Sequence, residues 1–156
     1  ECQINPNTGN PDHKKLSMPI HSAMAILSTS FIKPEKNTKL NIGIIGAGTG
    51  ALPMFLGRAL PFSNIVAVEK DSEILRVGSD YFGLPNSVEL VDMISSTNNT
   101  SGAECKRKKN KAVFVAGGGE DFLDAISNGD LQKCDVIVSD AFADGHAPPK
   151  GLDNFK

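Results

Sequence analysis

Hydrophobic positions along the chain follow two alternating patterns. Short apolar runs rich in β-branched residues, such as "LNIGII" at 40–45, are typical of strands buried on both faces of a sheet. Stretches in which apolar residues recur every three or four positions, such as 52–60, are typical of helices. The predicted strands are 40–45, 65–68, 112–116 and 135–139, and the predicted helices are 20–32, 52–60, 71–83 and a segment that begins at 121–126.

Strands and helices alternate in this pattern, which favours a parallel sheet with helices on both faces. We therefore predict an α/β, Rossmann-like, doubly wound fold. Asp71 or Ser72 is a suitable N-cap for the third helix, and Gly83 is a suitable stop.

The first helix is expected to pack on the sheet through one apolar side. Its apolar residues Ile20, Ala23, Met24, Leu27 and Phe31 recur at helical spacing. His21 lies among them, and a lone histidine on an apolar helix is interpreted as a packed residue.

Two polar segments lie outside this alternation. Residues 1–19 are predicted to form a polar N-terminal arm, and residues 95–111, which end in a basic run, are predicted to form a long mobile insertion. The remainder, 20–156, is expected to be a single domain.

A glycine-rich turn follows the first strand at once. Gly46, Gly48 and Gly50 allow a tight turn and a close backbone approach to a ligand, and with Ala51 they satisfy the pattern G-x-G-x-x-A. Glu69 ends the second strand, 19 residues after Gly50, where a carboxylate accepts hydrogen bonds from a ribose diol. The pattern predicts an adenosine-containing cofactor and leaves NAD and S-adenosylmethionine both open.

Acidic residues at the other strand ends favour one of these two cofactors. Glu120 and Asp121 follow the third predicted strand, and Asp140 and Asp144 follow the fourth. Ligands of such sheets bind at the carboxyl ends of the strands. Carboxylates there attract the sulfonium and ammonium groups of S-adenosylmethionine and repel a pyrophosphate. We therefore expect S-adenosylmethionine.

Composition and charge exclude several other classes of protein. The 156 residues are 40% hydrophobic and 22% charged, with a net charge of −2, so neither nucleic acid nor a membrane is an expected partner. Cys2, Cys105 and Cys134 are few and far apart, which fits neither a disulfide framework nor a metal site. A reducing compartment, the cytoplasm, is the expected location.

Five motifs in order carry a resemblance to a known family. "IIGAGTGALPMFL", "VAVEKDSEIL", "YFGL", "GGEDFL" and "DVIVSDA", preceded by "IHSAM" in the first helix, resemble the class I S-adenosylmethionine-dependent methyltransferases of the spermidine-synthase-like branch. Within that branch they are most similar to a methyltransferase domain that modifies lysine on a protein. The resemblance covers residues 20–149 apart from the insertion. Family members have seven strands, so the chain is expected to be the N-terminal part of such a domain.

The resemblance implies roles for individual residues. The implied cofactor-binding residues are Gly46, Ala47, Gly48, Gly50, Glu69, Lys70, Gly119, Glu120, Asp121 and Asp140. Gly118 stands where the family usually has an adenine-facing acid, so either Glu120 replaces that acid or the backbone alone holds adenine. Asp140 is the catalytic candidate, as the group that positions an acceptor amine, and His146 is a weaker candidate for substrate contact.

The implied reaction is methyl transfer to a lysine or another amine of a protein. Three alternatives stay open: aminopropyl transfer, an NAD-dependent oxidoreductase, and an inert homologue that binds the cofactor. Aminopropyl transferases carry a Tyr-His-Glu stretch in the early helix, and "IHSAM" lacks its tyrosine and glutamate. The oligomeric state is not predicted.

Overall fold

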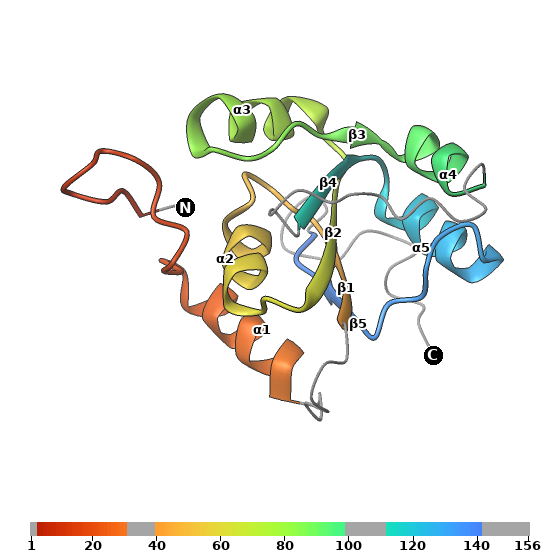
Figure 1. Cartoon of the computed structure of the whole chain (residues 1–156), viewed down its shortest axis with the longest axis horizontal. Helices are drawn as coiled ribbons and strands as arrows, with labels where there is room; N and C mark the ends of the chain where they lie inside the picture. The colour runs from red at the N-terminus through yellow and green to blue at the C-terminus, as the bar shows by residue number, and fades with distance from the viewer. Residues whose placement is uncertain (1–2, 31–39, 99–111, 142–156) are drawn as a thin grey trace.

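A five-stranded parallel sheet forms the centre of the computed structural model, which describes residues 3–30, 40–98 and 112–141 (Figure 1). The strand order is β3-β4-β2-β1-β5, and every pair of neighbours is parallel. The strands are β1 (Leu40–Ile45), β2 (Ser63–Glu69), β3 (Val88–Glu89), β4 (Ala112–Ala116) and β5 (Val136–Ser139). The helices are α1 (Pro19–Ser30), α2 (Ala51–Ala59), α3 (Ser72–Phe82), α4 (Leu90–Asn98) and α5 (Gly119–Asn128).

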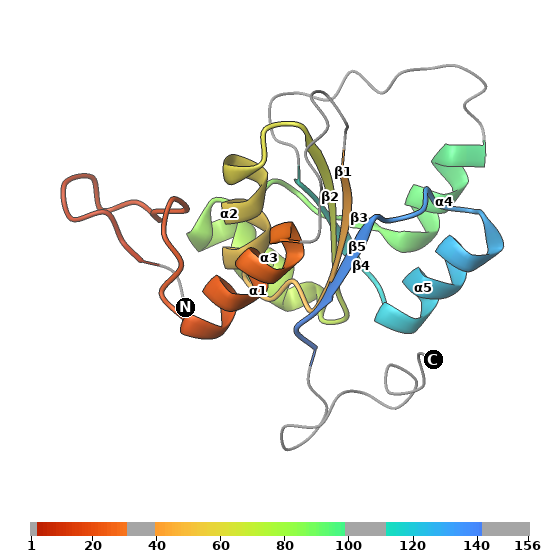
Figure 2. The ribbon, with the colours of Figure 1, turned by 90° about the horizontal axis from the view of Figure 1, so that it is seen from below.

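Helices cover both faces of the sheet, as predicted. Figure 2 shows α1, α2 and α3 on one side and α4 and α5 on the other. The chain moves outward from β1 to β2 and later returns to place β5 on the opposite side of β1. In sheets of this kind, the crevice at the carboxyl ends of the strands beside such a reversal is the usual ligand site. The predicted Rossmann-like fold is confirmed.

The central strands are apolar along most of their length because each contributes to two cores. Ile42 and Ile44 of β1 are buried on the side of α2 and α3, together with Leu56 and Leu75. Ile45, which points to the opposite face, is buried with residues of β4 and α5. Alternate residues of a strand point to opposite faces of the sheet. When helices cover both faces, both sets of residues are buried and are therefore mostly apolar.

Helix α1 is confirmed, but its buried side differs from the predicted one. The buried residues are Ala25 and Ser28, whereas Ile20 and Leu27 are 47% and 59% exposed. The helix packs against β5 and α2, where small side chains allow a close approach. Phe31 lies outside the described residues.

Two elements, β3 and α4, were not predicted. Helix α4 takes in residues 95–98, the start of the segment predicted as a mobile insertion; residues 99–111 lie outside the described residues. Its Leu90 is buried against the α5 side of the sheet. The hydroxyls of Ser95 and Ser96 bond to the backbone carbonyls of Val91 and Met93. Serine is a weak helix former, so the sequence pattern does not indicate this helix.

The predicted limits of α3 are confirmed. The Asp71 carboxylate accepts a hydrogen bond of 2.9 Å from the Glu73 N–H, as an N-cap does. Gly83 ends the helix in the left-handed conformation, with a φ of 72°. None of the helices in the described ranges has the length and apolar character needed to cross a membrane.

The N-terminal arm, described from residue 3, is fixed to the end of α3 by a histidine. His13 is 5% exposed, and its Nε2–H donates a hydrogen bond of 2.7 Å to the Phe82 carbonyl. Its Nδ1 is buried and has no hydrogen-bond partner among the residues that the structure describes. Burial lowers the pKa of His13 from its ordinary value of 6.5, because a charged imidazole is poorly solvated there.

This lowered pKa predicts a pH dependence of stability. The folded state disfavours protonated His13, so the stabilisation is complete above pH 6.5 and is lost as the pH falls through the folded-state pKa. His13→Gln keeps a donor for Phe82 and does not titrate. Thermal unfolding between pH 7.5 and 5 is expected to show a larger loss of Tm for the wild type than for His13→Gln. Equal losses of Tm in the two proteins would contradict the assignment of this pH dependence to His13.

Candidate functional site

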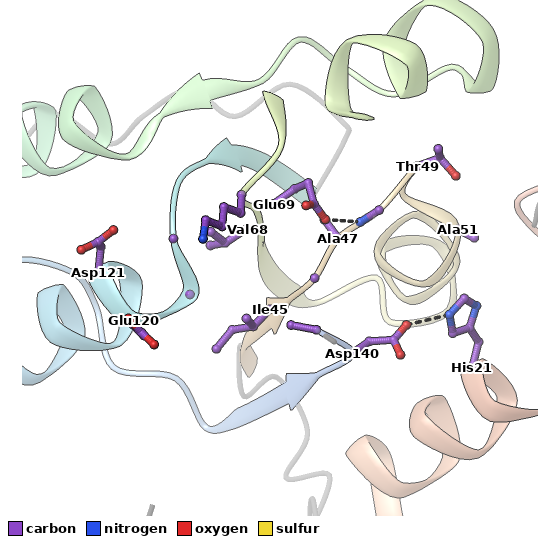
Figure 3. Close-up of a pocket in the computed structure, with 16 residues that line it drawn as sticks. His21, Ile45, Ala47, Thr49, Ala51, Val68, Glu69, Glu120, Asp121 and Asp140 are labelled. Atoms are coloured by element: carbon purple, nitrogen blue, oxygen red, sulfur yellow. Dashed lines mark hydrogen bonds and ion pairs between the residues drawn. The ribbon is translucent and has the colours of Figure 1, made fainter. Parts of the chain in front are cut away.

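A pocket of about 610 Å³ opens at the carboxyl ends of β1, β2, β4 and β5 (Figure 3). All four strands are parallel, so the loops that follow them gather at one edge of the sheet. The pocket is lined by His21, Ile45, Gly46, Ala47, Gly48, Thr49, Ala51, Val68, Glu69, Lys70, Gly118, Gly119, Glu120, Asp121, Asp140 and Ala141.

Gly46 lets the end of β1 lie directly against the end of β5. Its φ is +85°, and a Cβ at this position would lie 2.8 Å from the Asp140 carbonyl carbon and from the Ala141 nitrogen. Only glycine both adopts this positive φ readily and lacks the Cβ that would overlap Asp140 and Ala141. The backbone N–H groups of Gly46 and Ala47 both donate to the Val68 carbonyl, at 2.9 and 3.0 Å. The turn is therefore joined to β2 as well as to β5.

Glu69 closes the turn from the side of β2. Its Oε2 accepts a hydrogen bond of 2.9 Å from the Gly48 N–H, and its Oε1 accepts one of 3.2 Å from the Asp71 N–H. Each carboxylate oxygen has a second acceptor position. The two backbone bonds orient the carboxylate, and the remaining positions are available to hydroxyl groups of a ligand.

Asp140 lies at the end of β5 and is held at three points. Its N–H donates to the Ile45 carbonyl at 2.8 Å, and its backbone lies against Gly46. Its Oδ2 accepts a hydrogen bond of 2.8 Å from His21 Nε2, shown as a dashed line in Figure 3. Both side chains are mostly buried, with 13% (His21) and 16% (Asp140) of their surface exposed.

The start of α5 forms the far side of the pocket, and at two glycines its backbone lies close to neighbouring side chains. A Cβ on Gly118 would lie 2.6 Å from the Asp121 carboxylate, and one on Gly119 would lie 2.5 Å from Ile45. The residue that stands in place of an adenine-facing acid is thus a glycine covered by a neighbouring acid. Glu120 and Asp121 are exposed and point in different directions from the first turn (Figure 3).

The structure brings together nine of the ten predicted cofactor-binding residues; Gly50 alone does not line the pocket. Gly50 adopts a φ of +82°, and a Cβ there would lie 2.7 Å from the Leu84 side chain. The absence of a Cβ therefore allows the start of α2 to pack closely against Leu84. Asp144 and His146 lie outside the described residues. The binding roles themselves stay predictions.

His21 is the site residue that sequence reasoning missed. It was interpreted as a packed residue, yet it lines the pocket and bonds to Asp140. His21, Ala25 and Ser28 are spaced as one side of a helix, the side that faces the sheet. The sequence signal for this role was the position of His21 on the side of α1 that carries small residues. It does not lie on the side that carries the large apolar residues.

The pocket is acidic. Among the described residues, its lining holds four carboxylates, those of Glu69, Glu120, Asp121 and Asp140, and one lysine, Lys70. A cluster of this kind attracts cationic and hydroxyl-bearing ligands and disfavours phosphates.

Solved structures of known proteins are similar to this chain in fold. Human methyltransferase-like protein 13, solved in complex with S-adenosylhomocysteine, is 26% identical with a TM-score of 0.58, and the match covers 82% of this chain and 50% of that one. The chain is similar to the class I S-adenosylmethionine-dependent methyltransferases. A probable spermidine synthase from Corynebacterium glutamicum is 17% identical with a TM-score of 0.59 over 95% of this chain and 50% of that one, which shows the fold alone.

Curated proteins show the same resemblance in sequence. The eEF1A lysine and N-terminal methyltransferase homolog of Drosophila pseudoobscura pseudoobscura is 43% identical over 58 residues, or 37% of this chain, and that of Drosophila melanogaster is 34% identical over 84 residues, or 49%. The matched parts are 9% and 12% of those proteins, about a tenth of their length. No family model matches the chain.

The close approach at Gly46 predicts unequal effects of two glycine substitutions. Gly46→Ala adds strain at a positive φ and a Cβ that overlaps Asp140, so we expect a loss of more than about 2 kcal/mol in the free energy of unfolding. Gly48→Ala is the matched control, because its φ is +53° and nothing lies within 4 Å of its Cβ; about 1 kcal/mol is expected. Urea unfolding measures both. Equal losses would show that the contact with Asp140 is unimportant.

Proposed function

We propose that the chain is the cofactor-binding part of an S-adenosylmethionine-dependent methyltransferase that modifies an amine of a protein, at lysine or at the N-terminus. The observation that carries the proposal is the Glu69 carboxylate, hydrogen-bonded to the Gly48 N–H within an acidic pocket at the carboxyl ends of the strands.

The residues present fit S-adenosylmethionine. Glu69 offers its free acceptor positions to the two ribose hydroxyls. Gly46 and Gly119 bring the backbone of β1 and α5 up to the pocket without side chains. Glu120 and Asp121 provide acceptors for the adenine amine, and Asp140 attracts the positive charges of the methionine part.

The same contacts disfavour NAD. A dinucleotide needs free backbone N–H groups at the glycine turn for its pyrophosphate. Here the N–H groups of Gly46 and Ala47 donate to Val68, and that of Gly48 donates to a carboxylate. Pro53, in the first turn of α2, has no N–H to offer. A pyrophosphate at this turn would meet a negative charge in place of donors.

Residues of this chain contribute position and charge to the reaction. When bound, the cofactor would supply a methyl group on a sulfonium sulfur; the neutral acceptor amine would form the N–C bond as the S–C bond breaks, and the methylated ammonium would lose its extra proton to water. Asp140 is the proposed catalytic residue: its carboxylate accepts a hydrogen bond from the acceptor amine and directs the nitrogen lone pair toward the methyl group. Ile45 and Val68 form an apolar part of the pocket, which helps to exclude water.

A protein substrate is supported by the relatives, whose names describe lysine and N-terminal methyltransferases of eEF1A. The small number of cysteines favours a reducing compartment, so we propose that the protein acts in the cytoplasm. Aminopropyl transfer has less support, because the likeness to a spermidine synthase is one of fold and the early helix lacks the tyrosine and glutamate of that chemistry.

Titration calorimetry tests cofactor choice in the full-length protein. S-Adenosylmethionine and S-adenosylhomocysteine are expected to bind, and NADH is not. Glu69→Gln is expected to weaken binding about tenfold or more, because an amide nitrogen in place of one carboxylate oxygen removes a charged acceptor. Glu89→Gln is the matched control: Glu89 ends a strand of the same sheet but lies outside the pocket. Tight NADH binding would contradict the proposal.

Transfer of a labelled methyl group from S-adenosylmethionine to purified eEF1A tests the reaction. Labelled lysine or N-terminal residues are expected, with a loss of about a hundredfold in kcat for Asp140→Ala, comparable to the removal of a positioning group. Cofactor binding without any transfer, to eEF1A or to proteins of a cell extract, would instead support the inert homologue.

A further inference from the structure

The hydrogen bond between His21 and Asp140 joins two residues 119 positions apart in the sequence, at the mouth of the pocket. An ionised aspartate only accepts hydrogen bonds, so the proton of this bond belongs to His21 Nε2. The Nδ1 atom of His21 is buried and has no partner among the described residues. A buried N–H without a partner is costlier than a bare lone pair, so a proton on Nε2 fits this environment better than one on Nδ1 alone.

This bond leaves the Asp140 carboxylate with one oxygen in use and one free. Oδ2 is bonded to His21, and in the described part of the chain no donor is bonded to Oδ1. The backbone of Asp140 is already fixed by its bond to Ile45 and by contact with Gly46. The bond to the imidazole therefore limits rotation of the Asp140 side chain, and Oδ1 is the carboxylate oxygen that no described donor holds.

We propose that His21 is a positioning residue: it fixes the Asp140 carboxylate so that a single oxygen, Oδ1, receives the acceptor amine. The inference rests on the proposed function and adds a requirement to it. A single oxygen matches one N–H of a primary amine, whereas the parallel bonds of a guanidinium need both oxygens. The pair therefore favours lysine or an N-terminal amine over arginine as the acceptor.

A binding measurement tests this role without turnover. Sinefungin is an analogue of S-adenosylhomocysteine in which an amine-bearing carbon replaces the sulfur, so its amine lies near the position of the transferred methyl group. Calorimetry compares the two ligands on the full-length protein. The wild type is expected to bind sinefungin more tightly. His21→Leu is expected to lose about fivefold of that preference, and His21→Gln, which keeps a donor at the Nε2 position, to retain most of it.

His13 provides the matched control. It is also a buried histidine whose Nε2–H holds an acceptor, but it lies outside the pocket. His13→Leu is expected to lower stability and leave the sinefungin preference unchanged. A preference that survives in folded His21→Leu, or that is lost equally in His21→Gln, would overturn the inference while the binding of S-adenosylhomocysteine still supports the proposed function. Failure of the wild type to bind either ligand would contradict both.

The proton position and the kinetics provide two further readouts. Nitrogen-15 NMR of the imidazoles is expected to show His21 with a proton on Nε2, and a ring protonated on Nδ1 alone would contradict the inference. In methyl transfer to a lysine peptide, His21→Leu is expected to lower kcat about tenfold with little change in the KM for S-adenosylmethionine, and His21→Gln is expected to restore most of it. A change confined to that KM would assign His21 to cofactor binding instead.

Discussion

The hydrogen bond from the Gly48 N–H to the Glu69 carboxylate is the contact on which the rest of the site depends. It joins the turn after β1 to the end of β2, and the bonds from Gly46 and Ala47 to the Val68 carbonyl reinforce the same junction. A glycine turn of this kind is often a phosphate site, because its N–H groups point outward. Here the N–H groups of Gly46, Ala47, Gly48 and Gly50 already have acceptors, so the turn presents a fixed carboxylate to the ligand.

Close packing of the backbone explains why the acidic groups gather at one place. Gly46 allows β5 to end against β1, and Gly119 allows α5 to begin against Ile45. Without a Cβ at either position, the carboxylates that follow β2, β4 and β5 face one pocket of about 610 Å³. The acidic charge of the site therefore arises because two glycines allow three strand ends to pack close together.

Features with a local signal could be predicted from the sequence. Strands β1 and β4 were predicted to the residue, because a strand covered on both faces is a continuous apolar run. The limits of α3 followed from a capping aspartate and a terminating glycine. Helix α4 was missed because it contains serines, which are weak helix formers. In the structure their hydroxyls bond to carbonyls of the same helix. The bond between His21 and Asp140 has no local signal, because only the fold brings α1 to the end of β5.

We propose that the Glu69 carboxylate, oriented by the glycine turn, selects an adenosyl ligand through its ribose. A crystal structure of the full-length protein grown with S-adenosylhomocysteine tests this most directly. We expect a ligand in the pocket beside Gly46 and Gly48, with both ribose hydroxyls within hydrogen-bond distance of Glu69 and the homocysteine end toward Asp140. A ligand bound elsewhere, or a ribose turned away from Glu69, would contradict it.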